Sequence, residues 1–251
     1  RPAVDGLEFE QGKIYCCQAD RHLILEGDKM LLSRGPKENR FRPSIDALFR
    51  SAAYEFKERV IGVILSGALN DGTAGMCTIK RLGGLSMVQS PDEAAFNSMP
   101  VEVGNYTFVD HTLTAAELGQ MIGQLATKSI QPNIQLINKK EEMLEKEINI
   151  AKNINALDMG VFDSDRFTPF TCPDCHGALV QMNEDGIIRF RCHTGHGFTT
   201  DALLAGVTEN IEKDLWKVMR GMEEGNMVLK HLSDEFEKIG ADKTAQIFSE
   251  K

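Results

Sequence analysis

The hydrophobic pattern of the chain is most concentrated at Val60–Leu65, V-I-G-V-I-L, a short and almost wholly apolar run rich in β-branched side chains. Such a run is typical of a strand that is buried on both faces of a parallel sheet. A glycine-rich turn follows, and then an amphipathic segment at Met76–Leu82 predicts a helix. Strand, turn and helix in this order form the repeating unit of an open α/β sheet, where chemistry lies at the carboxyl ends of strands.

Further apolar runs extend this unit in both directions. The pattern predicts helices at Ser44–Lys57 and Thr114–Leu125 and strands at Lys13–Cys17, His22–Leu25, Met30–Leu32, Leu85–Gln89 and Thr107–Val109. The fold class is therefore α/β, with an incomplete doubly wound, mostly parallel sheet, because a complete one usually has five or more strands. Since the sequence opens on Arg1 rather than Met, we expect the chain to begin inside a longer protein.

The second half of the chain has a different pattern. Lys139–Leu157 predicts a helix with a narrow apolar stripe, which we expect to pack on a neighbour. Short strands at Ala178–Met182 and Ile187–Arg191 form a hairpin, and a long helix follows from Thr200 to about Ile239, with Trp216 and the methionines in its core. We therefore divide the chain into residues 1–128, a linker with a helix at 129–168, and a hairpin with C-terminal helices at 169–251.

Composition narrows the possible classes of function. Hydrophobic residues make up 42% and charged residues 26%, as in ordinary globular proteins, and no run of 18 apolar residues predicts membrane insertion. The net charge is −9, of which residues 129–251 carry −7, so neither half offers the basic face that nucleic acid requires. Without a secretory signal or a disulfide framework among the six cysteines, we expect a cytoplasmic protein.

Three of the cysteines have the spacing of metal ligands. Cys172 and Cys175 form a C-x2-C pair that presents two thiolates to one ion, and Cys192 with His196 completes a tetrahedral set of three sulfurs and one nitrogen. His193 is the alternative fourth ligand. The segment therefore predicts a structural Zn²⁺ in a zinc-ribbon hairpin, with no cofactor for catalysis. Thiol exchange is the weaker alternative, because a redox C-x-x-C needs no second pair of ligands.

Asp71 is the strongest catalytic candidate among the residues. It lies six residues beyond Val60–Leu65, in the turn S-G-A-L-N-D-G-T-A-G-M, where a strand of an α/β sheet ends. An aspartate just before a helix can equally be its N-cap. The position alone therefore supports catalysis and capping about equally.

Three linked motifs favour the catalytic interpretation. The turn, the segment R-F-R-P-S-I-D-A-L-F at Arg40–Phe49 and the segment F-N-S-M-P at Phe96–Pro100 resemble the CheB-type chemotaxis protein-glutamate methylesterase domain. The resemblance runs from about Gly12 to Leu125. It implies that Asp71 is the third member of a Ser-His-Asp triad and that a backbone N–H near Ala68 supplies part of an oxyanion hole.

The chain also departs from the family pattern. The family turn more often reads T-G-M-G-x-D-G, and here Ala68 and Leu69 replace the Met-Gly pair, which a backbone donor tolerates. No G-x-S-x-G sequence occurs, and the family's catalytic histidine belongs to a segment upstream of this chain, so we interpret His22 as a strand residue. We therefore expect this chain to be inactive alone.

The resemblance implies a carboxylic ester hydrolase that removes methyl groups from glutamyl esters, with glutamine deamidation as a further activity. Its partners would be methyl-accepting chemoreceptor helices or a related signalling protein in a chemotaxis-type pathway. The C-P-x-C and R-C-H-x-G-H-x-F motifs are similar to an extension found after some stand-alone methylesterase domains. The alternative interpretation is a non-catalytic, zinc-containing regulatory or protein-interaction module that docks through the long helix.

Overall fold

The structure is a computed structural model that describes residues 1–130, 141–162, 166–184 and 186–249. The chain forms two compact units, Arg1–Leu204 and Ala205–Lys251, and each is described by itself.

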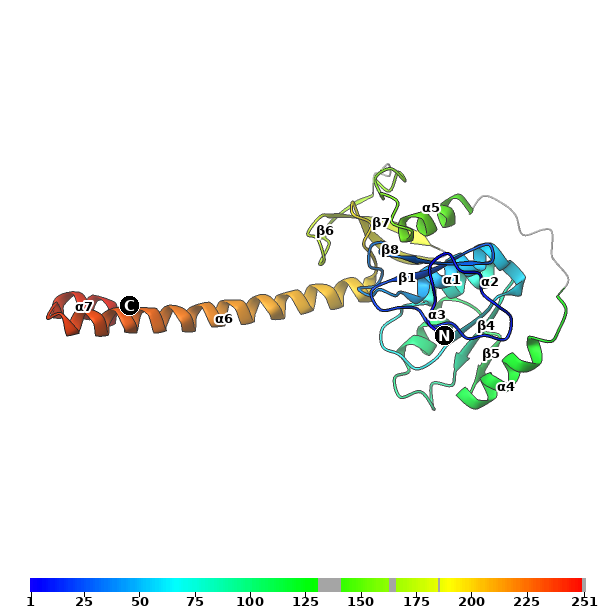
Figure 1. The fold of residues 1–251 in the computed structure, drawn as a ribbon, viewed down its shortest axis with the longest axis horizontal. Helices are drawn as coiled ribbons and strands as arrows, with labels where there is room; N and C mark the ends of the chain where they lie inside the picture. The colour runs from blue at the N-terminus through cyan, green and yellow to red at the C-terminus, as the bar shows by residue number, and fades with distance from the viewer. Residues whose placement is uncertain (131–140, 163–165, 185, 250–251) are drawn as a thin grey trace. The chain divides into compact units, whose positions relative to one another are not determined.

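The centre of the first unit is a three-stranded parallel sheet. Its strands are β3 (Ile61–Ile64), β4 (Leu85–Gln89) and β5 (His111–Leu113), in the order β3-β4-β5. Helices α2 (Thr73–Arg81) and α3 (Ser98–Tyr106) connect successive strands, as parallel pairing requires, and Figure 1 shows them beside β4 and β5. The predicted α/β class with a parallel sheet is therefore confirmed.

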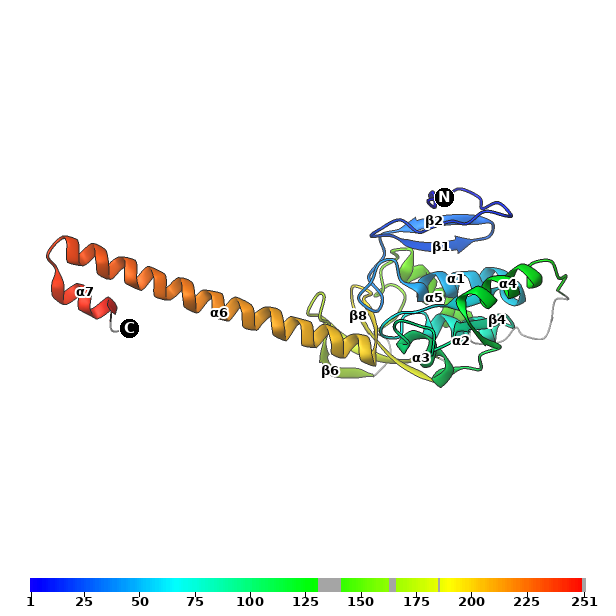
Figure 2. The ribbon, with the colours of Figure 1, turned by 90° about the horizontal axis from the view of Figure 1, so that it is seen from below.

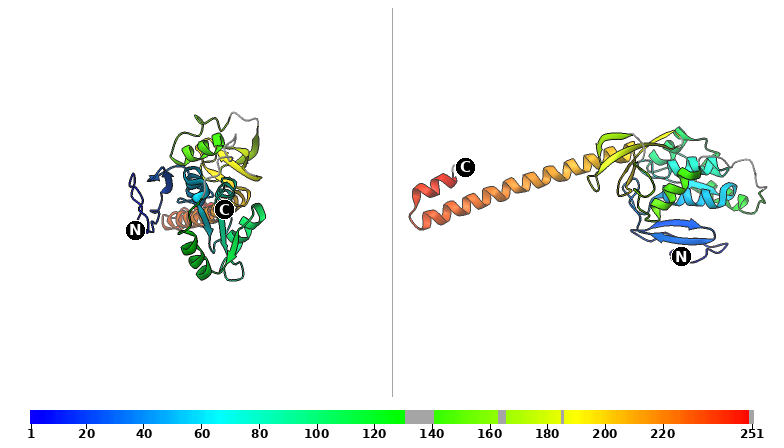
Figure 3. Two further views of the ribbon diagram at one scale, coloured as in Figure 1. Left: turned by 90° about the vertical axis from the view of Figure 1, so that its right-hand side faces the viewer. Right: turned by 90° about the horizontal axis from the view of Figure 1, so that it is seen from above.

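Helices and a hairpin build the layers next to this sheet. They are α1 (Ile45–Phe56), the short 3₁₀ helix η1 (Lys57–Arg59), α4 (Ala115–Leu125), and the antiparallel strands β1 (His22–Glu26) and β2 (Lys29–Ser33). The hairpin lies against α1 (Figures 2 and 3). There the Ser51 hydroxyl accepts a hydrogen bond from the Leu25 N–H at 3.0 Å. Helices α1 and α2 approach closely because Gly75 has no side chain: a Cβ there would lie 2.5 Å from the Cβ of Phe49.

Three strand predictions need correction. The run at Lys13–Cys17 forms no strand and pairs only through an isolated bridge between Pro2 and Cys16. The third strand of the sheet begins at His111 rather than Thr107, because the chain joins β4 only where the Asp110 N–H donates to Ser86. Strand β3 alternates between half-buried and buried residues, since it is an edge strand of the described sheet and not a central one.

The hairpin that carries the cysteines belongs to the first unit. It is part of a four-stranded antiparallel sheet of β6 (Phe167–Thr171), β7 (Ala178–Glu184), β8 (Ile187–Cys192) and β9 (Gly197–Thr199), which we call the ribbon. Helix α5 (Glu141–Ala151) is shorter than the helix predicted at 139–157, because it ends six residues before Leu157. Residues 139 and 140 lie outside the described residues. The apolar stripe packs on its neighbours at Leu144, Ile148 and Ala151, which are buried, but not at Met143 or at Ile154 beyond the helix, which are exposed.

The second unit consists of most of α6 (Thr200–Lys238) and of α7 (Asp242–Ser249). The Ser233 hydroxyl donates to the Ala245 carbonyl at 3.0 Å, and the rings of Phe236 and Phe248 stack at 5.5 Å. The prediction that Trp216 is a core residue is wrong within this unit, because 60% of its surface is exposed. Among the described residues, no helix has the length and apolarity that crossing a bilayer requires.

Candidate active site and metal site

Asp71 lies beyond the carboxyl end of β3 and is only 8% exposed. Its Oδ2 accepts the Ile45 N–H at 2.7 Å, and its Oδ1 accepts the Ser44 hydroxyl at 2.7 Å. The carboxylate therefore caps the N-terminus of α1 from outside that helix. Its own helix, α2, has Gly72 at the N-cap, with a φ of +94° that favours glycine. Asp71 thus does act as a cap, but for a helix 26 residues earlier in the chain.

Asn39 links Asp71 to a second buried carboxylate. Its side-chain amide donates to Asp71 Oδ1 at 3.0 Å and to Asp46 Oδ2 at 2.9 Å. Asp46 also accepts the Gly75 N–H at 2.7 Å, which ties α1 to α2. The sequence analysis missed Asn39, although it directly precedes the quoted motif R-F-R-P-S-I-D-A-L-F. Only the fold shows that this loop residue meets the turn after β3.

Burial sets the protonation of this pair of acids. Loss of solvation and, to a lesser extent, the nearby charge of Asp46 raise the pKa of Asp71 to about 6, although hydrogen bonds from Ile45, Ser44 and Asn39 act to lower it. Burial also raises the pKa of Asp46. A buried carboxyl group whose protonation changes near neutral pH is a candidate functional group.

A serine and a histidine lie beside Asp71, but they do not form a triad with it. The imidazole Nδ1 of His22 accepts the backbone N–H of Ser44 at 3.2 Å, and its Nε2 lies 2.9 Å from the Pro36 carbonyl. The Ser44 hydroxyl donates to Asp71 and not to the histidine. In a catalytic triad the serine hydroxyl meets the imidazole, and the imidazole meets the carboxylate. His22 is thus a buried residue of β1, as predicted.

Ala68 lies in the exposed part of the same turn. The turn is held against the F-N-S-M-P segment, because the Gly67 N–H donates to the Phe96 carbonyl at 2.9 Å and the Met99 N–H donates to the Gly67 carbonyl at 3.1 Å. Among the described residues, none accepts a hydrogen bond from the Ala68 N–H. That N–H remains able to donate to a ligand.

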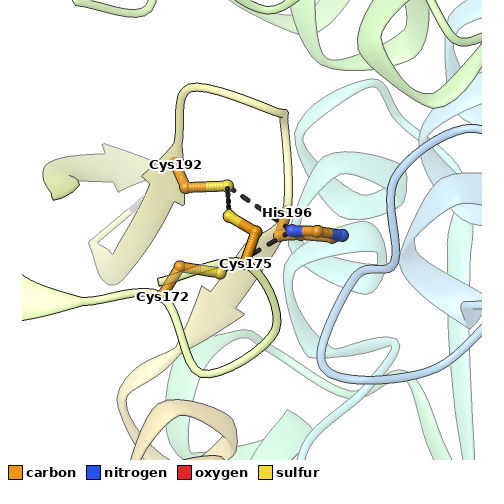
Figure 4. Close-up of side chains that lie close together, drawn as sticks. All are labelled: Cys172, Cys175, Cys192 and His196. Carbon is orange, nitrogen blue, oxygen red and sulfur yellow. Dashed lines mark hydrogen bonds between the residues drawn. The ribbon is translucent and has the colours of Figure 1, made fainter. Parts of the chain in front are cut away.

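Four side chains of the ribbon gather around one point, as Figure 4 shows. The ligand atoms of Cys172, Cys175, Cys192 and His196 all lie within 4.8 Å of one another. The Nδ1 of His196 is 3.6 Å from the sulfurs of Cys172 and Cys192. Contact between the two thiols raises the pKa of Cys172 and lowers that of Cys192. A metal ion binds thiolates, so it would displace the protons that these cysteines carry. The cluster can hold one metal ion.

His193, the alternative fourth ligand, is not part of this cluster. Its side chain is exposed and lies against Gly177, where a Cβ would come within 2.3 Å of the His193 Nδ1. A different side chain, the Thr194 hydroxyl, approaches the ligands and lies 3.0 Å from the Cys192 sulfur. The fold therefore places a ring nitrogen of His196, and not one of His193, within the group of three sulfurs.

A buried cluster of charges joins the ribbon to the rest of the first unit. Three arginines and three glutamates form it: Glu38, Arg50, Glu147, Glu184, Arg189 and Arg191. Glu38, in the loop before α1, forms ion pairs through its Oε2 with Arg50 Nη1 at 2.7 Å and with Arg189 Nη2 at 2.9 Å. Burial opposes its ionisation, but the charges of Arg50 and Arg191 lower its pKa to about 2. The ribbon is therefore fixed to α1 by ion pairs that water does not screen.

Comparison with known proteins places residues 1–122 in one family, because the family model for the CheB methylesterase matches them. A relative from Leptospira interrogans, named for protein-glutamate methylesterase and protein-glutamine glutaminase activities, is 36% identical over 132 residues, covering 52% of this chain and 68% of that protein. The protein-glutamate methylesterase/protein-glutamine glutaminase of Escherichia coli K12 is 32% identical over 126 residues, covering 49% of this chain and 36% of its own.

A solved structure is also similar over the same part of the chain. The catalytic domain of the Thermotoga maritima CheB methylesterase has 29% sequence identity and a TM-score of 0.49, and the similarity covers 50% of this chain and 68% of that one. The matched relatives are hydrolases by name, and the matched region contains Asp71, Ala68 and Asn39. Through residues 1–122, this chain belongs to the CheB methylesterase family of protein-glutamate methylesterases.

Proposed function

We propose that residues 1–128 are the aspartate-bearing part of a protein-glutamate methylesterase, and that Asp71 is the acid of its Ser-His-Asp triad. The observation that carries this proposal is the place of Asp71: a buried carboxylate at the carboxyl end of a parallel strand, inside the family match, and held by four hydrogen bonds. Oδ2 accepts only the Ile45 N–H among the described residues, so it has capacity for an imidazole N–H.

In such a site each residue has a defined task. The serine attacks the carbonyl carbon of the glutamyl methyl ester, the histidine takes its proton, and methanol leaves before water releases the acyl-enzyme. Asp71 fixes the tautomer of the imidazole and stabilises the imidazolium. The free N–H of Ala68 is a donor for the developing oxyanion, a contribution typically worth about 3 kcal/mol.

The substrate class follows from the names of the relatives. We propose glutamyl methyl esters on methyl-accepting chemoreceptor helices, with glutamine deamidation by the same acyl-transfer chemistry, in the cytoplasm. Neither activity needs a catalytic cofactor. The net charge of −9 argues against nucleic acid as a partner.

We further propose that the four ligands of the ribbon bind a structural Zn²⁺. Three thiolates and one imidazole nitrogen within 4.8 Å suit the tetrahedral preference of Zn²⁺, and protein side chains would fill all four positions. A filled coordination shell offers no place for substrate or water. The ion would therefore stabilise the ribbon and take no part in ester hydrolysis.

The test compares two polypeptides for methanol release from methylated receptor. The 251-residue chain has no G-x-S-x-G sequence, so it should release none. A polypeptide in which a serine- and histidine-bearing segment precedes Arg1 should be active, and Asp71→Asn should lower its turnover by about 10⁴-fold because the imidazole adopts the wrong tautomer. Asp20→Asn is the matched control, since that aspartate is exposed and pairs only with Arg42 among the described residues.

Each contrary result has a defined meaning. Methanol release by the 251-residue chain alone would contradict the triad assignment. An active longer polypeptide that is indifferent to Asp71→Asn would leave Asp71 as the cap of α1 only. If the longer polypeptide releases no methanol, the non-catalytic regulatory module becomes the better interpretation, with the ribbon and the long helix as its interaction surfaces.

A further inference from the structure

The last strand of the ribbon is bonded directly to the loop that holds Asp71. The Asn39 N–H donates to the Gly197 carbonyl at 2.8 Å, and the Gly197 N–H donates to the Lys37 carbonyl at 3.1 Å. The Thr199 N–H donates to the side-chain oxygen of Asn39 at 3.1 Å. The amide of Asn39 is therefore held at its oxygen by the ribbon, while its nitrogen donates to Asp71 and Asp46.

This contact fixes which way the amide points. If the amide turned over, its oxygen would face two carboxylates and its NH₂ group would face the Thr199 N–H. All three hydrogen bonds of the side chain would then be lost. Asn39 is 1% exposed, so water cannot replace those bonds. Its φ of +50° is one that asparagine tolerates better than most side chains. The position thus favours asparagine for its backbone and for its amide.

A second contact of the same kind reaches the residue before Asp71. The Thr199 hydroxyl donates to the side-chain oxygen of Asn70 at 2.7 Å, and the Asn70 amide donates to Asp201 at 3.1 Å. Thr199 and Asn70 are both buried. One residue of the ribbon, Thr199, therefore contacts both asparagines that flank the carboxylate, one through its backbone and one through its side chain.

The strand that makes these contacts begins beside a metal ligand. His196 directly precedes Gly197, the first residue of β9, and its carbonyl accepts the N–H of Cys192, another ligand. Thr199, which contacts the side chain of Asn39, is thus only three residues after the ligand His196. A change in the position of His196 must move Thr199 or strain the segment between them.

We propose that Asn39 is a positioning residue for Asp71, and that the metal-bound ribbon sets its orientation through Thr199. The ribbon is then a part of the Asp71 site and not a separate appendage. The catalytic meaning of this arrangement rests on the proposed triad role of Asp71. The physical coupling between the ribbon and the Asp71 carboxyl does not.

The coupling can be measured in the 251-residue chain by following the Asp71 carboxyl carbon through a pH titration by NMR. Asn39→Gly keeps the left-handed backbone but removes a donor to the charged carboxylate, so the pKa of Asp71 should rise by about one pH unit. Asn39→Asp keeps the shape and adds a third carboxyl group, so the rise should be larger. Asn153→Gly is the matched control, because Asn153 has a φ of +74° and an exposed side chain.

Metal removal by a chelator tests the role of the ribbon. It should raise the pKa of Asp71 in the unsubstituted chain and add little in Asn39→Gly, because the same donor is already missing. The charged or titratable groups that face the Asp71 network are Asp46 and Arg50 from α1, Glu38 from the loop before α1, His22 from β1, Glu184 from β7 and Asp201 from α6. Their carboxyl and imidazole signals are followed in the same spectra, so that a general change of the fold is recognised.

Two results would overturn the proposal. One is an Asp71 pKa in Asn39→Gly that equals the value in Asn153→Gly. The other is metal loss that disorders 178–192 while the Asp71 pKa stays unchanged. In the longer, active polypeptide, Asn39→Gly should lower kcat with little change in KM. If that polypeptide has no esterase activity, the proposed function fails, yet the NMR titration still decides whether Asn39 positions Asp71.

Discussion

Two carboxylates, Asp46 and Asp71, are buried within one hydrogen-bond network, an arrangement that costs free energy whenever both are ionised. The cost is offset by donors from both sides: backbone N–H groups of α1, the Ser44 hydroxyl and the Asn39 amide for Asp71, and the Gly75 N–H for Asp46. Buried acids with raised pKa values are concentrated at functional sites. The pH dependence of stability should therefore reveal them.

Asp71 should make the protein less stable as pH rises from about 4 to about 6. The unfolded chain loses the Asp71 proton near its ordinary pKa, while the folded chain keeps it up to about pH 6, so the native state binds more protons in this window. Asp71→Asn should make the fall in the free energy of unfolding shallower, by at most about 1 kcal/mol per pH unit. The measurement is urea unfolding at several pH values.

Asp110→Asn is the control for this experiment. Burial opposes the ionisation of Asp110, but Lys80 and Ser86 lower its pKa overall, so its contribution to stability is lost at low pH. That substitution should lower the free energy of unfolding, yet above pH 5 it should not change how steeply this free energy depends on pH. A residual slope from Glu184, whose pKa burial raises to about 7, should remain in every variant. An Asp71→Asn protein with the full slope would mean that Asp71 ionises at its ordinary pKa.

Residues could be predicted where their chemistry is local to the sequence. The spacing named the three cysteines Cys172, Cys175 and Cys192, and it left the fourth position to His196 or His193. Asp71 could be named because a strand and a glycine-rich turn precede it. Asn39 could not, since its partners come from α1, the turn after β3 and the ribbon, and no sequence period joins those segments. The choice between His193 and His196 also required the fold.

At the scale of elements, the predicted bounds were correct where glycines or other helix-ending residues mark the end of an element. Strand β4 has the predicted bounds because Gly83 and Gly84 end the helix before it. The prediction that β3 is buried on both faces was wrong. An apolar sequence indicates a strand, but it does not show that the strand lies at the edge of the described sheet. The apolar stripe of α6 was expected to be a core, yet its side chains are largely exposed within the second unit. A 3.6-residue period shows a face but not what covers it.

The ribbon should depend on one zinc ion for its fold. Its four short strands bury a small cluster that includes Leu179, Phe190 and Phe198, too little to hold the sheet alone. Elemental analysis should find one Zn²⁺ per chain. His196→Ala should release it on dialysis, whereas His193→Ala should keep it, because only His196 has a ring nitrogen within 4.8 Å of the three sulfurs. Zinc-free protein whose segment 178–192 still resists amide exchange would contradict a structural metal.

At the scale of the whole molecule, the first unit is held together by charges as well as by apolar contacts. The six members of the buried cluster come from the loop before α1, from α1, from α5 and from two strands of the ribbon. A buried charge that loses its partner is strongly destabilising, so these elements depend on one another. We therefore expect the methylesterase part and the ribbon to unfold as one cooperative body, although the sequence pattern divides them at residues 128 and 168.

Glu38→Gln tests this cooperation, because Glu38 faces Arg50, Arg189 and Arg191 at once. Removing its charge should lower the free energy of unfolding by about 3 kcal/mol, since the arginines are left without part of their compensation. Amide exchange in increasing urea should show 61–89 and 178–192 losing protection at the same concentration, and Glu38→Gln should lower both midpoints equally. Glu235→Gln, an exposed glutamate paired with Lys238, should change neither. If the ribbon loses protection first while 61–89 keeps it, the charge cluster does not couple the two, and the boundaries drawn from the sequence describe independent domains.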